Sequence, residues 1–153
     1  MISTELVINF ILSECENVTN KKLQKLCYYE YAWYITTFKR RLMDVRFEAW
    51  AHGPVSPRIY NQYKKYGWNV IPQYFDYLPI DEYTVAFMEN ILRYYRKFSA
   101  DDLEQMTHEE DPWRIAREGY KPYESSRQVI TDEDIIEYYS RRFDLIDILH
   151  ISI

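Results

Sequence analysis

Apolar side chains recur at three- and four-residue spacing along most of this chain, which predicts a mainly helical protein. The first such stretch predicts a helix over about residues 4–15. The second predicts a longer helix that begins after a cap at Thr19 or Asn20 and reaches about Lys39. The apolar positions expected on the buried face of this second helix are Leu23, Leu26, Cys27, Tyr31, Tyr34, Ile35 and Phe38.

One charged residue, Glu30, falls within that buried face. A carboxylate in such a position must be hydrogen-bonded, paired with a cation or protonated. We expect a structural partner, such as a tyrosine hydroxyl or an arginine. A catalytic role for Glu30 is the alternative.

A strand and a turn are expected over residues 42–55, where helical spacing gives way to alternation. Two sets of side chains would face opposite sides of this strand, Phe47, Ala49 and Ala51 on one and Glu48, Trp50 and His52 on the other. Gly53-Pro54 would form the turn, because proline cannot continue a strand ladder. Ser56-Pro57 then predicts the cap and first residue of a helix.

The rest of the chain predicts further helices, over about residues 57–66, 82–98, 99–106, 111–119 and 131–146. The last of them would bury Ile135, Tyr139, Phe143 and Ile146. The polar stretch 120–130 is expected to be a loop. The sequence therefore predicts a mainly α fold, one compact domain over residues 1–153 with a small β-sheet or hairpin around residues 44–55.

Composition indicates a protein with a real core that is a poor general binder of nucleic acid. The chain is 47% apolar and has a net charge of -5, with an excess of basic residues over 1–75 and of acidic residues over 76–153. We expect two positive clusters to be solvated helix ends, Lys21, Lys22 and Lys25 at one end and Lys39, Arg40 and Arg41 at the other. The 16 Tyr and 4 Trp suit a half-buried core rim, with a partner-binding face as the alternative.

The two cysteines, Cys15 and Cys27, lack the CxxC spacing of a zinc site and do not suggest a disulfide scaffold. The N-terminal apolar run is interrupted by Asn9 and is too short to span a bilayer. We therefore expect a cytoplasmic protein with reduced thiols and no membrane association.

No stretch carries a recognised catalytic or phosphate-binding motif. The patterns HExxH, GxSxG, GxGxxG and GxxxxGK[ST] are absent, and the three glycines lie far apart. We expect no catalytic residue, no metal and no cofactor. A small enzyme or ligand-binding domain that uses His52 and His108 in one pocket is the alternative.

Four motifs occur in order along the chain: Lys22–Tyr29 with Trp33-Tyr34; Phe47–Val55 with Pro57, Ile59-Tyr60 and Tyr66-Gly67; Thr107-His108 with Pro112-Trp113 and Ala116-Arg117; and Ile130–Ile135. Together they resemble the Panacea domain family over about residues 4–140. This family includes SocA-like antitoxins and phage-associated GepA-like proteins.

The resemblance implies an antitoxin that binds a toxin made from a neighbouring gene and blocks it by direct contact. In SocA-like members the antitoxin is also an adaptor that hands the toxin to a ClpXP-type protease. An accessory protein of a prophage or mobile element, with no toxin partner, is the alternative.

The candidate functional residues are those of the family motifs: Trp33, Trp50, His52, Gly53, Pro54, Tyr60, Thr107, His108, Pro112 and Trp113. We interpret the central ones as structural. Trp50 would fill the core, and His52 would hydrogen-bond a backbone carbonyl. Direct contact with the toxin is the alternative for all of them.

Overall fold

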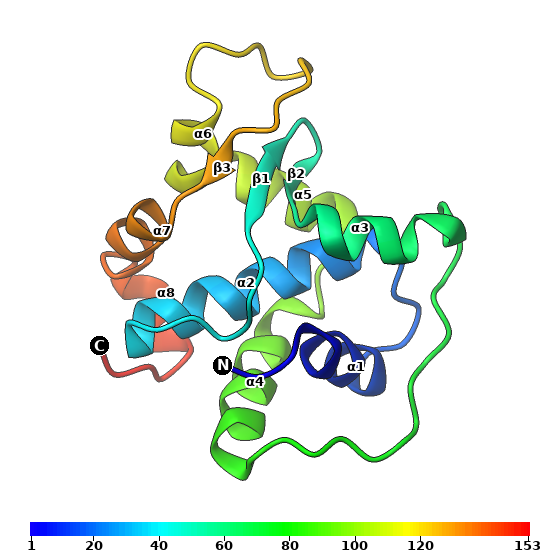
Figure 1. The fold of residues 1–153 in the computed structure, drawn as a ribbon. Helices are drawn as coiled ribbons and strands as arrows, with labels where there is room; N and C mark the ends of the chain where they lie inside the picture. Colours follow the sequence, from blue (N-terminus) through cyan, green and yellow to red (C-terminus); the bar gives the residue numbers. More distant parts are fainter.

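The computed structural model describes residues 1–153 as eight α-helices and one small sheet (Figure 1). The longest helix, α2 (Asn20–Phe38), runs through the middle of the molecule. The others are α1 Thr4–Glu14, α3 Pro57–Tyr63, α4 Glu82–Tyr95, α5 Ala100–His108, α6 Asp111–Ala116, α7 Asp132–Tyr139 and α8 Phe143–Ile148, with a short 3-10 helix, η1, at Lys64–Tyr66. The predicted mainly α fold with a small sheet is confirmed.

Helix α2 is buried on every side and not on one face alone. Every residue from Leu23 to Thr36 is buried, because α1, α3, α4, α5, α7 and strand β2 all pack against this helix. Its predicted cap is confirmed, since the Thr19 hydroxyl accepts a hydrogen bond from the Lys22 N–H. The prediction that Lys25 is a solvated helix end is wrong, because its side chain is only 1% exposed.

The sheet contains three antiparallel strands in the order β2-β1-β3: β1 Phe47–Trp50, β2 Gly53–Val55 and β3 Val129–Ile130. The prediction that Gly53-Pro54 forms the turn is wrong. Both residues belong to β2, and the turn consists of Ala51 and His52. Proline is accommodated there because β2 is an edge strand, which leaves one side of its ladder unpaired. Strand β3 lies at the end of the stretch predicted as a loop.

The predicted last helix is in fact two helices, α7 and α8, that are separated at residues 140–142. The break places Arg142 so that it donates to the Tyr138 hydroxyl at 2.7 Å and to the Asp144 carboxylate at 3.0 Å. Phe143 begins α8 and is 73% exposed, so its predicted burial is wrong. Helix α6 also ends earlier than predicted, at Ala116.

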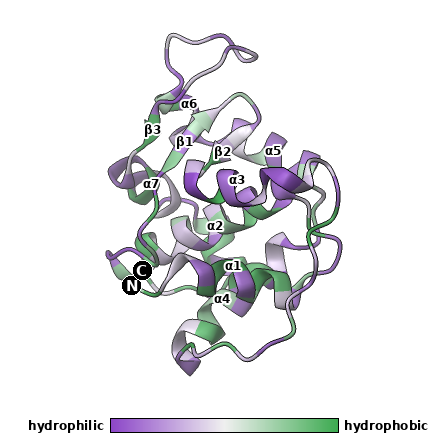
Figure 2. Cartoon of the chain, turned by 45° about the vertical axis from the view of Figure 1, so that its right-hand side comes forward, coloured by the Kyte–Doolittle hydropathy of each residue, from purple (hydrophilic) through white to green (hydrophobic).

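The apolar side chains of the helices form one core around α2. Figure 2 shows the green, apolar parts of α1, α2 and α4 in the middle of the molecule, whereas the loop above β3 is white and purple. Several of the 16 tyrosines belong to this core, since Tyr28, Tyr29, Tyr95 and Tyr139 are each at most 1% exposed. No helix combines the length and the apolar character that a bilayer crossing requires.

Candidate functional site

Two of the motifs meet at the backbone of β1. The indole N–H of Trp113 donates to the Trp50 carbonyl at 2.8 Å, and the Arg117 guanidinium donates to the Ala49 carbonyl at 2.9 Å. His108 stacks on Trp113 with 3.9 Å between the ring centroids. These contacts attach α5 and α6 to the strand that carries Trp50.

The other residues of the third motif lie in or near the interior. Thr107 is fully buried, and its hydroxyl donates to the Glu104 carbonyl at 2.7 Å. Pro112 is also buried. His108 is half-buried, its Nε2 atom has no hydrogen-bond partner, and burial lowers its pKa. This motif therefore exposes little of its side-chain surface.

His52 lies in the exposed turn between β1 and β2, and 77% of its side chain is exposed. The expected bond to a backbone carbonyl is wrong, because His52 Nδ1 instead lies 2.9 Å from Glu104 Oε1. Glu104 also contacts Lys21 Nζ at 3.1 Å. Partial burial would raise the pKa of Glu104, but these two partners lower it overall. An exposed pair of this kind contributes at most about 1 kcal/mol to stability.

A pocket of about 420 Å³ opens beside this turn, between α2, the hairpin and α3. Its walls carry three lysines and three aromatic residues, Lys21, Lys25, Lys64, Trp50, Tyr60 and Trp68. His52 lines the pocket and His108 does not. The placement of both imidazoles in this pocket, which the enzyme alternative requires, is therefore not observed.

The aromatic wall of the pocket is built by two motif residues. The Trp50 and Tyr60 rings meet edge to face with 5.0 Å between their centroids. Trp50 is half-buried, and its indole N–H donates to the Glu48 carboxylate at 2.9 Å. Trp50 thus borders the pocket and does not lie in the centre of the core as expected.

Lys25 is a buried ionisable residue in the wall of the pocket. Its ammonium donates to the Pro54 carbonyl at 3.2 Å, and no carboxylate lies within ion-pair distance. Burial lowers the pKa of Lys25 to about 7. Gly53 makes room for this side chain, because a Cβ atom on Gly53 would lie 2.5 Å from Lys25 Cε. Sequence reasoning missed Lys25, since nothing in its spacing distinguishes it from a surface lysine.

A buried carboxyl, Glu110, lies in the core and not at the pocket. Its Oε1 atom accepts hydrogen bonds from the hydroxyls of Tyr29 at 2.7 Å and Tyr139 at 2.9 Å. Arg142 lies 3.6 Å from its second oxygen. Burial raises the pKa of Glu110 to about 7, although these partners oppose the shift. Trp33 donates to the Tyr95 hydroxyl at 2.7 Å, and the Tyr95 ring stacks on Tyr29 with 4.0 Å between the centroids.

Glu30 is fully buried, and neither of its carboxyl oxygens has a hydrogen-bond partner. The expected tyrosine or arginine partner is therefore wrong. Burial raises the pKa of Glu30 well above its ordinary value, which makes the neutral carboxylic acid the stable form inside the protein.

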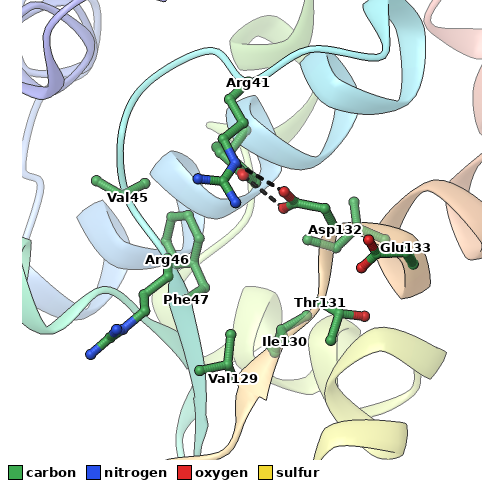
Figure 3. Close-up of a pocket in the computed structure, with 11 residues that line it drawn as sticks. Arg41, Val45, Arg46, Phe47, Val129, Ile130, Thr131, Asp132 and Glu133 are labelled. Carbon is green, nitrogen blue, oxygen red and sulfur yellow. Dashed lines mark hydrogen bonds and ion pairs between the residues drawn. The ribbon is translucent and has the colours of Figure 1, made fainter.

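A second pocket, of about 230 Å³, lies between β1, β3 and the start of α7 (Figure 3). Arg41 and the Tyr31 hydroxyl both donate to the Asp132 carboxylate, at 3.0 Å and 2.7 Å. Figure 3 shows Arg46 directed away from this group. These contacts compensate the charge of Asp132, and the Tyr31 hydroxyl links the start of α7 to α2.

The chain was compared with known protein families, curated proteins and solved structures. A family model described as "Antitoxin SocA-like, Panacea domain" matches residues 23–114, from α2 into α6. The flanking stretches 4–22 and 115–140, which the sequence resemblance also included, lie outside this match. Neither the curated proteins nor the solved structures compared with the chain give a match. Because the family model covers more than half of the chain, this protein belongs to the SocA-like antitoxin family with the Panacea domain.

Proposed function

We propose that this protein binds a toxin made from a neighbouring gene and blocks it by direct contact. The observation that carries this proposal is the family match over residues 23–114. An antitoxin of this kind needs a surface for a protein partner. The molecule offers one in the connection between η1 and α4.

This connection and the first turn of α4 expose four aromatic side chains. Trp68, Phe75, Tyr77 and Tyr83 are each between 81% and 85% exposed. Aromatic residues are enriched at the centres of protein interfaces, where a few of them supply most of the binding energy. We call residues 68–83 the aromatic segment.

The first half of the aromatic segment is attached to α1 and to the connection that follows it. Its backbone N–H groups at Ile71 and Tyr74 donate to the carbonyls of Val18 at 2.8 Å and Leu12 at 3.2 Å. Figure 1 shows the segment running along the outer side of the molecule before it reaches α4. These bonds hold the backbone between Trp68 and Phe75, so a partner would lose less entropy on binding there.

Delivery of the toxin to a ClpXP-type protease would be a second step that uses the same complex. Comparison of a host that lacks ClpX with its parent separates the two activities. Neutralisation that persists without ClpX indicates blocking by contact, and neutralisation that disappears indicates delivery.

Co-expression with the product of the adjacent gene tests the proposal. We expect that product to arrest growth alone, and to be harmless and co-purified when this protein is present. The double variant Phe75→Ala, Tyr77→Ala should weaken the complex at least tenfold, as expected for interface anchors. Tyr123→Ala is the control, since Tyr123 is 78% exposed but lies in the loop after α6. A toxic product that is neither bound nor neutralised would exclude the proposed function.

A further inference from the structure

We propose that the pocket beside the β1–β2 turn binds a carboxylate that is attached to an aromatic or aliphatic group, as presented by an acidic segment of a partner protein. The attribution of this carboxylate to the toxin rests on the proposed function. Carboxylate binding by the pocket does not rest on it. Four features of the pocket support the inference.

The first feature is an excess of positive charge, because only one of the three lysines in the wall forms ion pairs. Lys21 is paired with Asp101 at 2.7 Å and with Glu104 at 3.1 Å. Lys25 and Lys64 also line the pocket and form no ion pair, and no aspartate or glutamate is among the lining residues. An incoming anion would therefore meet two lysines without an ion pair, and its charge would favour the protonated form of Lys25, whose pKa burial lowers to about 7.

The second feature is the incomplete hydrogen bonding of Lys25. An ammonium group has three N–H donors, and the only acceptor it finds here is the Pro54 carbonyl. A buried cation is costly unless it is paired, and the protein itself already removes most of the water around Lys25. A carboxylate in the pocket would supply both the missing charge and a missing acceptor without a new desolvation of Lys25.

The third feature is the position of the pocket at the first turn of α2. Asn20 and Lys21 begin this 19-residue helix and line the pocket. The first N–H groups of a helix lack intrahelical acceptors, and the helix dipole places partial positive charge at this end. Both effects add to the attraction that the lysines exert on an anion.

The fourth feature is the aromatic wall. Trp50 and Tyr60 form a fixed corner, and Trp68 is 84% exposed at the rim. These faces would cover an apolar group that is attached to the carboxylate. The pocket therefore favours an amphiphilic ligand over a free inorganic anion.

Two observations favour a carboxylate over a phosphate. No arginine lines the pocket, although its forked guanidinium is the side chain best matched to phosphate. The net charge of -5 on the chain repels a polyphosphate or a nucleic acid, with several negative charges, more strongly than a single carboxylate. A single buried ammonium matches the single charge of a carboxylate.

The probe pair N-acetylphenylalanine and N-acetylphenylalaninamide tests this inference, because the two differ only in the carboxylate. Binding is followed by the shifts of the indole N–H signals of Trp50 and Trp68 in NMR spectra of the intact protein. We expect a Kd on the order of 1 mM for the acid, as for a ligand of this size. The amide should bind at least about tenfold more weakly. Equal binding of the two probes, or tighter binding of AMP than of the acid, would overturn the carboxylate assignment.

Substitutions locate the site. Lys25→Met should weaken binding of N-acetylphenylalanine about tenfold or more, and Trp68→Ala should weaken it several-fold. Lys22→Met is the matched control, because Lys22 donates to the Arg96 carbonyl outside the pocket. If Lys25→Met fails to fold, Lys64→Met and Trp68→Ala carry the test, since both side chains are exposed. Unchanged binding in the folded variants would overturn the proposal.

Binding measurements on the toxin complex test the pocket and the proposed function separately. Lys25→Met and Trp68→Ala should weaken the complex with the adjacent gene product, and N-acetylphenylalanine should compete with that product. A pocket that binds the probe while no toxin is bound by the wild-type protein would sustain the pocket and remove the antitoxin function. A toxin complex that neither variant weakens and the probe does not displace would remove the attribution of the carboxylate to the toxin.

Discussion

Three buried ionisable side chains in the centre of the molecule affect its stability. Lys25 and Glu30 lie on α2, and Glu110 lies at the start of α6, and all three are at most 5% exposed. Only Glu110 has several hydrogen-bond partners. Glu30 has none, so its burial should lower stability in a pH-dependent way.

The replacement of Glu30 by methionine should stabilise the protein, and more so at high pH. Well below pH 4.5 the carboxyl is protonated in both the folded and the unfolded chain. As pH rises above the ordinary value of 4.5, the unfolded chain ionises first because burial raises the pKa in the folded state. Wild-type stability therefore falls with rising pH, and Glu30→Met removes this loss. We expect a gain of about 1–3 kcal/mol at pH 8 and a smaller gain at pH 4.5.

Urea denaturation at both pH values measures this difference. Glu89→Met on α4 is the control, because Glu89 is exposed and its replacement should change stability by less than about 0.5 kcal/mol at either pH. A Glu30→Met variant that is less stable than wild type at pH 8 would mean that the carboxylate has a partner in the folded protein.

Gly53 should tolerate no side chain, because of its neighbour as well as its backbone. Its φ is +108°, and an added Cβ would lie 2.5 Å from Lys25 Cε. Gly53→Ala should therefore destabilise the protein by about 2–5 kcal/mol. Gly119→Ala, at φ +90° with no atom within 4 Å, should cost only the backbone strain of about 1–2 kcal/mol. Thermal denaturation of both variants measures the difference.

A double variant isolates the steric part. Lys25→Ala removes the atom that the new methyl group would meet, so Gly53→Ala should cost less in that background than in the wild type. Equal costs in the two backgrounds would show that Lys25 does not occupy the space beside Gly53.

One side chain, Arg117, connects two elements of the fold, the loop over residues 120–128 and the sheet. Its guanidinium donates to the Ala49 carbonyl in β1 and to the carbonyls of Lys121 and Glu124 in the loop. A lysine has one compact ammonium and cannot span these acceptors. Arg117 follows α6 and belongs to the third sequence motif.

Arg117→Lys should free this loop. We expect amide hydrogen exchange over residues 120–128 to accelerate at least tenfold, and stability to fall by about 1.5–3 kcal/mol. Arg114→Lys on α6 is the control, because the Arg114 side chain is 62% exposed. Unchanged exchange in Arg117→Lys would assign the order of the loop to other contacts.

Local signals in the sequence are sufficient to predict the positions of most helices. The Ser56-Pro57 start of α3 and the Ser99–Asp102 capping box of α5 are both present in the structure, because such caps depend only on neighbouring residues. Strand β3 was missed, since two residues are too few for a periodic pattern. The break between α7 and α8 was missed because it depends on contacts of Arg142 with side chains along the last two helices and at the start of α6.

The candidate site was predicted only in part, and the reason lies at the scale of the whole molecule. The motif residues Trp50, His52 and Tyr60 do line one pocket. The sequence predicts a solvated Lys25, whereas its burial follows from the packing of α3, α5 and β2 around α2. Periodicity describes one helix against one core and cannot show a helix that is enclosed on all sides.

The central claim is neutralisation by a stable complex, and isothermal titration calorimetry with the purified product of the adjacent gene measures it most directly. We predict saturation at a fixed whole-number ratio with a Kd below about 1 μM, as expected for a stable protein complex. The same titration with the Phe75→Ala, Tyr77→Ala variant should show a Kd at least tenfold higher. A product that arrests growth, is neutralised in cells by this protein and yet gives no binding in this titration would contradict the account.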